Sequence, residues 1–349
     1  MSLSQPARWK AGRCFFASHA LRRLGCLCGA SLLAAMLSQP AQAGDSAAEI
    51  RLWFDKMAHS SQKLSYEGTF VYRRGEQMTS MKIIHVADEN GERERLISLD
   101  GPMREIVRDS RGMARIVTDK KAMTVDNRGS TRSLLSKMSE QLDQIEKYYA
   151  FSMGGDSRAA NRLARIINIT PRDAYRYGYR VALDQQTGAL LQSDLLNEHG
   201  VPLEQVVFIT FELLDKVPPA MREPAARSEP PNTQSAPSPL PHHLQGDEGW
   251  KIVKAPPGFL LAEHYRHPAA HGHGFMNHMV FTDGLASVSV FIEKNRGAAP
   301  FLGVSSIGVA NAYGTRVNDH QVTVVGEVPV GTVEMIGKSV KYQVEGGAK

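Results

Sequence analysis

A proline-rich segment interrupts the chain about two thirds of the way along. Eight prolines stand among the residues from Val217 to Pro241, interleaved with Ser, Ala, Glu and Arg. Proline lacks a backbone N–H and favours an extended chain, so neither a helix nor a central strand can run through such a stretch. The sequence therefore predicts a linker over residues 217–246 between two domains, residues 44–216 and 247–349, each long enough to form its own core.

The N-terminal segment has the composition of an export signal. Before residue 44 it carries no acidic residue and five basic ones: Arg8, Lys10, Arg13, Arg22 and Arg23. The apolar stretch that follows, Leu24–Leu37, is short for a membrane-spanning helix. Small residues at Ala41 and Ala43 fit the site that signal peptidase cleaves. The sequence predicts a signal peptide over residues 1–43, cleavage before Gly44 and export of the mature chain out of the cytoplasm.

The charge balance changes once this segment is set apart. The whole chain has 41 Lys and Arg against 36 Asp and Glu, a formal charge of +5. Without the segment the two signs balance, and all three cysteines (Cys14, Cys26 and Cys28) are gone as well. A neutral, exported protein is a poor partner for nucleic acid. A mature chain without thiols has no disulfide and no cysteine metal ligand.

Hydrophobic spacing in the first domain predicts two helices and about ten antiparallel strands. One helix starts near Ser46, and a second runs from Ser133 to Tyr149. Strands are predicted at 66–73, 78–86, 92–99, 105–108, 114–118, 123–126, 164–170, 175–183, 190–196 and 205–215. Met153–Asp156 is interpreted as a loop after the second helix. Two helices cannot cover this much sheet, so we expect a strongly curved sheet that wraps over them and can enclose a cavity.

The second domain is predicted to be a small antiparallel sheet with one covering helix. Strands are expected at 251–253, 260–265, 276–282, 287–293, 312–316 and 321–327, with the helix at 330–342. Asp283–Gly284 and Asn318–Asp319 have the composition of hairpin turns. Together the two domains place the chain in the α+β class.

Six longer motifs are informative through their order along the chain. They are YEGTFVYRR from Tyr66, RLISLDG from Arg95, REIVR from Arg104, LDQQTG from Leu183, FTDGLASVSVF from Phe281 and DHQVTVVGEVP from Asp319. In this order the motifs resemble the MucB/RseB family, periplasmic negative regulators of an envelope-stress sigma factor, and most of all its pseudomonad members. The resemblance covers essentially the whole mature chain.

The resemblance carries expectations about fold and partners. It implies a first domain similar to the lipoprotein carriers LolA and LolB, a half-barrel sheet around a hydrophobic pocket. It implies that the chain binds the periplasmic part of a membrane-spanning anti-sigma factor, MucA, and shields it from the initiating site-1 protease. A lipid-like or lipopolysaccharide-like stress signal would then release the partner.

Candidate ligand-binding residues lie on the first predicted strands. Tyr66, Phe70 and Tyr72 alternate along one strand and therefore share one face of the sheet, and Ile84 is added from the next strand. Core packing is the ordinary role of such residues. A curved sheet with few helices can instead present them to an acyl chain, which makes these four residues the candidates for a lipid pocket.

A local excess of positive charge follows these strands. Between Arg93 and Arg132 there are ten Lys or Arg and six Asp or Glu. Such an excess is usually a solvated face, and the alternative is recognition of lipid phosphates or of an acidic partner segment. The candidate anion-binding residues at the pocket rim are Arg93, Arg95, Arg104 and Arg108.

A histidine cluster is the remaining candidate for site chemistry. It contains His264, His267, His271, His273 and His278. Imidazole is a common metal ligand, but acidic co-ligands are sparse and the segment is rich in Pro and Gly, so it is interpreted as a solvated loop without a physiological metal. The sequence also lacks G-x-S-x-G, P-loop and H-E-x-x-H motifs. We therefore predict no catalytic residue, no cofactor and no enzymatic activity.

Two functions remain after these exclusions. The first is a non-enzymatic periplasmic regulator that binds the anti-sigma factor and releases it when a lipid-like signal binds. The alternative is a periplasmic carrier of lipids or lipoproteins, for which the second domain and the linker would be unnecessary. A third, weaker hypothesis is a scavenger of metal or ligand that uses the histidine loop. The sequence leaves open the natural lipid, the contact residues, the export route, whether the histidine loop binds metal and whether the chain forms a homo-oligomer.

Overall fold

The structure is a computed structural model that describes most of the chain after the N-terminal segment. The described residues are 43–89, 91–108, 113–118, 122–126, 138–222, 242–243, 249–268, 274–295, 297 and 299–343. Residues 42–349 belong to one compact unit. The predicted signal peptide, apart from Ala43, and most of the predicted linker lie outside the described residues.

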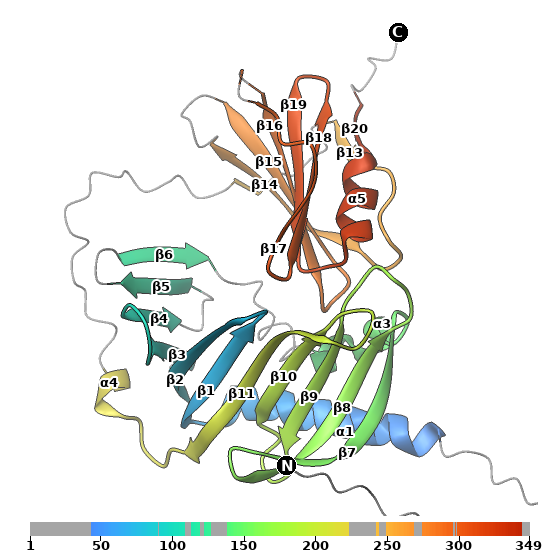
Figure 1. Ribbon diagram of the computed structural model, residues 1–349. Coiled ribbons are helices and arrows are strands. Elements are labelled where there is room, and N and C mark those ends of the chain that lie inside the picture. The colour runs from blue at the N-terminus through green and yellow to red at the C-terminus, as the bar shows by residue number, and fades with distance from the viewer. Residues whose placement is uncertain are drawn as a thin grey trace, which may run out of the picture. The chain divides into compact units, whose positions relative to one another are not determined.

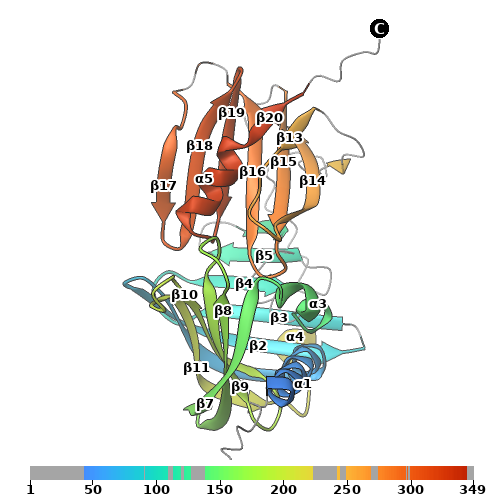
Figure 2. The same ribbon diagram turned by 90° about the vertical axis from the view of Figure 1, so that its right-hand side faces the viewer.

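The first part of the chain forms an antiparallel sheet of eleven strands, here called the large sheet. Its strands are β1 Tyr66–Arg74, β2 Gln77–Asp88, β3 Gly91–Ser98, β4 Arg104–Arg108, β5 Met113–Thr118, β6 Ala122–Asp126, β7 Tyr149–Ala159, β8 Arg162–Pro171, β9 Gly178–Asp184, β10 Leu190–Leu196 and β11 Pro202–Leu213. Their order is β6-β5-β4-β3-β2-β1-β11-β10-β9-β8-β7. In Figure 2 the strands β2 to β5 run across the view while β7 and β8 stand upright, so the sheet turns strongly along its length.

Two helices pack against one end of the large sheet. Helix α1 (Ala43–Lys63) crosses behind the strands in Figure 1, and α3 (Met138–Ile145) lies beside it. Apolar residues at helical spacing in α1, among them Ile50, Phe54 and Met57, share a buried core with Val181 and Leu183 of β9. The apolar residues of α1, spaced three and four apart, therefore form a single face that packs on the sheet, as predicted.

Strand β7 corrects two predictions. The helix expected to reach Tyr149 ends at Ile145, and Tyr149 is instead the first residue of β7. Met153–Asp156 was predicted to be a loop but lies inside this strand, where the register with β8 shifts. The shift accommodates Gly154, at which a side-chain Cβ would lie 2.6 Å from Ile166 Cγ2. A glycine pair that looks like a loop in sequence therefore marks a bulge.

The second part of the chain forms a seven-stranded antiparallel sheet, here called the small sheet. Its strands are β12 His242–His243, β14 Leu260–Pro268, β15 Phe275–Thr282, β16 Ser287–Lys294, β17 Gly303–Ile307, β18 Ala310–Val317 and β19 His320–Gly326. Helix α5 (Val330–Lys338) packs its Val333 and Ile336 into a core with Val322 and Val324 of β19. The α+β class and the antiparallel sheets agree with the predictions.

The second part and the predicted linker also differ from the predictions at four places. The final helix ends at Lys338 rather than residue 342, because Val340–Tyr342 forms strand β20, which pairs with β13 (Trp250–Ile252). Strands β12 and β17 were not predicted, and β12 lies within the predicted linker. Helix α4 (Pro219–Arg222) falls within the predicted linker, and its Met221 is buried against Ile84 and Val86 of β2.

Candidate functional site

The aromatic residues of β1 lie on one face of the large sheet, as their alternation predicts. Tyr66 and Phe70 are buried, and Tyr72 is partly buried beside them. Gly68 stands between them, and a Cβ there would lie 3.0 Å from ring atoms of Phe208. The glycine thus lets a ring from the neighbouring strand β11 pack directly over β1.

Two phenylalanines of β11 complete this cluster. The ring centroids of Phe70 and Phe208 are 5.5 Å apart, and those of Tyr66 and Phe211 are 4.8 Å apart. Both separations are typical of favourable aromatic pairs. We call Tyr66, Phe70, Tyr72, Phe208 and Phe211 the aromatic cluster. The sequence predictions did not single out Phe208 and Phe211, because they are three residues apart and strict alternation assigns them to opposite faces.

A bulge brings these two phenylalanines to one side. Thr69 pairs with Thr210 and Phe70 pairs with Phe208, which leaves Ile209 without a partner in the ladder. An extra residue in one strand breaks the two-residue period, so side chains three apart can meet on the same face.

Strand pairing also shows which face carries the aromatic cluster. Directly paired residues share a face of a sheet, and the pairs run from Tyr72 through Val206 and Ser193 to Val181. Val181 belongs to the core that α1 and α3 cover. The aromatic cluster therefore lies on the helix side of the large sheet, next to the part that the helices cover.

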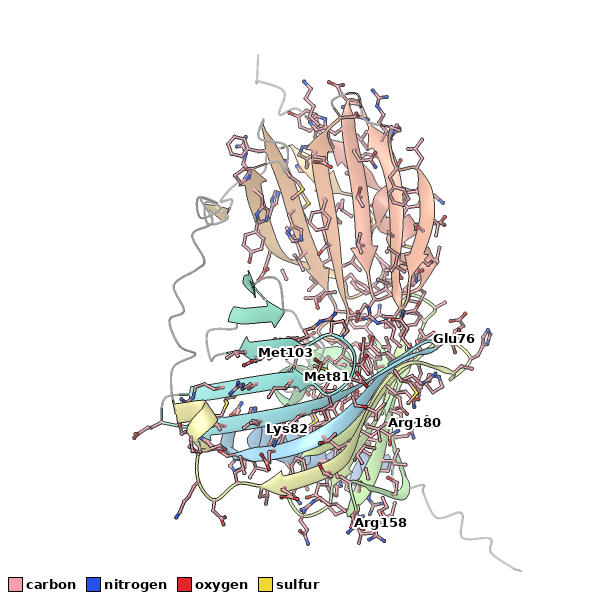
Figure 3. The ribbon with its side chains drawn as sticks, turned by 60° about the vertical axis from the view of Figure 1, so that its left-hand side comes forward. Glu76, Met81, Lys82, Met103, Arg158 and Arg180 are labelled. Carbon is pink, nitrogen blue, oxygen red and sulfur yellow. The ribbon has the colours of Figure 1, made fainter. Side chains whose placement is uncertain are left out.

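Ile84, the fourth candidate, lies on the other face of the sheet. It pairs with Glu67, the neighbour of Tyr66, and strand alternation turns the two side chains to opposite faces. Its buried neighbours are Val86 and Met221. Figure 3 labels a similar adjacent pair on the same strand, Met81 and Lys82, of which Met81 packs against the aromatic cluster. The structure therefore groups only three of the four candidates.

The candidate arginines are mostly engaged by carboxylates. Arg93 forms an ion pair with Asp88, Arg95 Nε lies 2.6 Å from Glu105 Oε1, and Arg108 Nη1 lies 3.6 Å from Glu94 Oε1. Arg104 is exposed. Three of the four candidate arginines therefore each have a carboxylate partner.

The same arginines are divided between the two faces of the sheet. Arg95 pairs with Ile84 in the ladder, and Arg93 pairs with Val86, so both lie opposite the aromatic cluster. Arg108 pairs with Glu94, Glu94 pairs with His85, and His85 pairs with Tyr66 of the aromatic cluster. Arg108 therefore lies on the same face as the aromatic cluster. Only Arg104 and Arg108 thus share a face with the aromatic cluster.

The histidine cluster is largely part of the sheet, which corrects the predicted loop. His264 and His267 lie in β14 and His278 lies in β15, whereas His271 and His273 lie outside the described residues. The His278 ring stacks on Phe291 at 4.3 Å, and Nε2 is 3.0 Å from Ser289 Oγ. Burial, followed by the nearby His267, lowers the pKa of His278 to about 4. Because the His278 imidazole is neutral at pH 7, it can pack against its neighbours within a strand.

Within the described part of the chain, no group of three or more His, Cys, Asp or Glu side chains is arranged to hold a metal ion. No described helix is both long and apolar enough to cross a membrane. The aromatic cluster is therefore the described feature that best fits the predicted ligand site.

The two antiparallel sheets, with an aromatic cluster on the large one, define the chain as a two-sheet α+β protein. Family models make the assignment specific. The MucB/RseB N-terminal domain matches residues 49–226, and the MucB/RseB C-terminal domain matches residues 244–341. The chain belongs to the MucB/RseB family.

Individual relatives match this chain over most of their length. The sigma factor AlgU regulatory protein MucB of Pseudomonas aeruginosa is 31% identical over 89% of this chain and 94% of its own. The solved complex of Pseudomonas aeruginosa MucA and MucB matches at 29% identity with a TM-score of 0.68, covering 85% of this chain and 99% of that chain. A crystal structure of MucB matches at 29% identity with a TM-score of 0.53, covering 86% and 99%. This MucB is named as a regulatory protein of the sigma factor AlgU.

Proposed function

We propose that the mature chain binds the periplasmic segment of a MucA-type anti-sigma factor and shields it from the site-1 protease. The observation that carries this proposal is the match to the MucA/MucB complex, which extends over 85% of this chain and 99% of the solved one. A match of that extent includes both sheets. A carrier of lipids would need only the large sheet, so the regulator is the better supported of the two functions.

The periplasmic location is part of the proposal. It is supported by the basic residues, the short apolar stretch and the Ala41–Ala43 site in the N-terminal segment. N-terminal sequencing of the protein from a periplasmic extract should begin at Gly44. A membrane-bound form that begins at Met1 would contradict the location.

Release of the partner is proposed to follow binding of a lipid-like signal at the aromatic cluster. The cluster is apolar and lies on the helix side of the large sheet, and acyl chains favour apolar cavities. Arg104 and Arg108 share its face and supply positive charge for an anionic headgroup. Linkage requires that a lipid which weakens partner binding tenfold is itself bound tenfold more weakly by the complex.

Calorimetry tests the binding step directly. The periplasmic segment of the anti-sigma factor from the same organism is titrated into the mature chain, then into the chain saturated with lipopolysaccharide. We expect saturable binding in the first titration and at least tenfold weaker binding in the second, about 1.4 kcal/mol. Absence of binding in the first titration would contradict the proposed function.

The titrations also separate regulator from carrier. A carrier is expected to bind lipopolysaccharide or lipoprotein but not the anti-sigma segment. Equal affinity for the segment with and without bound lipopolysaccharide would contradict lipid-triggered release. The proposal that the chain shields the segment from the protease would still stand.

A further inference from the structure

An arginine with a fully buried side chain connects the two sheets. Arg176 lies between β8 and β9 of the large sheet, and its side chain has no exposed surface. Within its own part of the chain, Nε donates to Asp173 Oδ1 at 3.1 Å. Its other nitrogens reach the second part, where Nη2 donates to the Pro257 carbonyl oxygen at 2.5 Å and Nη1 lies 3.0 Å from Asp283 Oδ2. Asp283 is equally buried.

Aromatic rings surround this guanidinium. Its central carbon lies 4.9 Å from the ring centroid of Tyr148, 5.2 Å from that of Phe259 and 5.5 Å from that of Tyr149. Arginine suits such a site because its planar cation stacks on rings while its N–H groups donate at the edge. A lysine would keep the charge but lose the fork of donors.

The carboxylate of Asp283 is satisfied from both sides. Oδ1 accepts the backbone N–H groups of Leu285 and Ala286 at 2.9 and 2.7 Å, which fixes the turn between β15 and β16. Oδ2 accepts the hydroxyl of Tyr149 at 3.0 Å in addition to its ion pair. We call Arg176, Asp283 and Tyr149 the joint.

The joint is continuous with the core of the large sheet. Tyr149 belongs to the buried cluster formed by α1, α3 and the strands β8 and β9, and Leu285 and Val309 from the second part belong to the same cluster. Two hydrogen bonds flank it: Asn311 Nδ2 donates to Tyr177 Oη at 3.1 Å, and Thr332 Oγ1 donates to the Tyr175 carbonyl at 2.5 Å. The contact between the two parts therefore combines apolar packing with directed polar bonds.

Buried ion pairs favour one geometry more than they add stability. The cost of removing two charges from water offsets much of their attraction, so an apolar pair of similar volume is often equally stable. Directed bonds from Arg176 and Tyr149 nevertheless fit only one placement of the Asp283 turn. Solved MucB structures match this chain to different extents at nearly equal coverage, with TM-scores of 0.68 for the MucA/MucB complex and 0.53 for a crystal structure of MucB. Proteins of this family are thus found in shapes that differ.

We propose that the joint holds the small sheet in one position against the large sheet, and that capture of the anti-sigma segment depends on this position. Arg176 is thus a positioning residue. The dependence on the partner rests on the proposed function, but the joint itself is testable without any partner.

The first measurement is a distance distribution between the two sheets. The mature chain has no cysteine, so Glu198→Cys on the large sheet and Ser305→Cys on the small sheet, both exposed, give a pair of spin-label sites. The pair is measured by electron paramagnetic resonance with and without Arg176→Met/Asp283→Asn. The double change avoids an uncompensated buried charge. We expect a narrow distribution in the parent chain and a clearly broader or shifted one in the double variant.

The chain offers a matched control within the large sheet. Arg162 Nε donates to the buried Asp184 at 2.9 Å, and both residues belong to neighbouring strands of that sheet. Arg162→Met/Asp184→Asn removes the same kind of pair without touching the small sheet, so it should leave the distribution narrow. If Arg176→Met/Asp283→Asn does not fold, Arg176→Lys takes its place.

The second measurement is affinity for the anti-sigma segment in the same variants. We expect the joint variant to bind at least tenfold more weakly and the control variant to bind like the parent. A narrow, unshifted distance distribution in the folded joint variant would contradict the claim that the joint holds the small sheet in position. An altered distribution with unchanged affinity would overturn its role in capture. If the parent fails to bind the segment, the proposed function and the capture role fail together, and the distance measurement still decides whether the joint exists.

Discussion

Gly68 shows how one absent side chain shapes the candidate ligand site. A Cβ at this position would lie 2.5 Å from the Thr210 carbonyl oxygen as well as 3.0 Å from the Phe208 ring. Real structures do not tolerate the first distance, so β1 and β11 would have to separate. The packing of the aromatic cluster therefore depends on the absence of a side chain at Gly68.

We predict that Gly68→Ala lowers the free energy of unfolding by about 1–3 kcal/mol, the range expected for overpacking. Denaturant titration followed by tryptophan fluorescence measures the change. Gly155→Ala is the matched control, because a Cβ at Gly155 meets nothing within 4 Å and the backbone there is not left-handed. Equal effects of the two changes would show that the close approach at Gly68 is unimportant.

The buried imidazole of His278 makes stability depend on pH. Burial and the neighbouring His267 lower its pKa to about 4, against about 6.5 in an unfolded chain. Between these values the unfolded state binds the proton more tightly. The contribution to stability is therefore complete above pH 6.5 and is lost as the pH falls towards 4.

We predict that His278→Phe, which preserves the stacking on Phe291, flattens the decline in stability between pH 6.5 and pH 4. The difference should be about 1 kcal/mol, because solvent around the partly exposed ring screens the effect. Thermal unfolding at several pH values measures it. His199→Phe, at an exposed turn, should leave the pH dependence as in the parent, and a parallel shift of both curves would contradict the assignment.

Among the secondary-structure elements, helices and strands with a regular hydrophobic period could be predicted from the sequence. A strand whose period is interrupted by a bulge could not. Strands such as β1 and β16 follow alternation closely, and α1 follows helical spacing, so the sequence predicted them within a few residues. Strand β7 was missed because Gly154 and Gly155 have the composition of a loop, and only contact with β8 makes them a bulge.

The joint shows a different limit of sequence reasoning. The sequence predicts a strand over residues 175–183 that includes Arg176, whereas in the structure this residue lies just before β9 and is buried. Its burial depends on Asp283 and Pro257, about a hundred residues away, and no local pattern reports such a partner. Asp283 was predicted correctly as a turn residue, yet its second role as a buried counter-ion has no local signature.

Helix α4 provides a test at the element scale. Met221 packs on Ile84 and Val86, and Arg93 Nη1 donates to the Met221 carbonyl oxygen at 3.0 Å. We predict that Met221→Glu detaches this helix, because a carboxylate cannot remain in an apolar contact at modest cost. Deuterium exchange should then rise in residues 214–222. Leu213→Glu, at an exposed position, should change little, and equal exchange in the two variants would contradict the docking of α4.

For the whole molecule, the linker and the joint have opposite effects. A proline-rich linker over residues 217–246 is predicted to let two domains move, whereas the joint and the shared core around Leu285 and Val309 hold the two parts together. We therefore propose domains that are separate in the chain but coupled in the folded protein.

Limited proteolysis distinguishes these alternatives. We expect cleavage within residues 223–245, after which the two fragments remain associated in size-exclusion chromatography. In the Arg176→Met/Asp283→Asn background the fragments should separate. Immediate separation of folded fragments from the parent chain would instead support a flexible hinge without a joint. Resistance to cleavage throughout 223–245 would contradict the linker.

Protection of the anti-sigma factor tests the central claim most directly. The periplasmic segment is incubated with its site-1 protease alone, with the mature chain, and with the mature chain plus lipopolysaccharide. We predict that the mature chain slows cleavage at least tenfold and that lipopolysaccharide restores it, because the ligand-bound state holds the partner more weakly. Cleavage at the same rate with and without the mature chain would contradict the claim that this protein shields an anti-sigma factor.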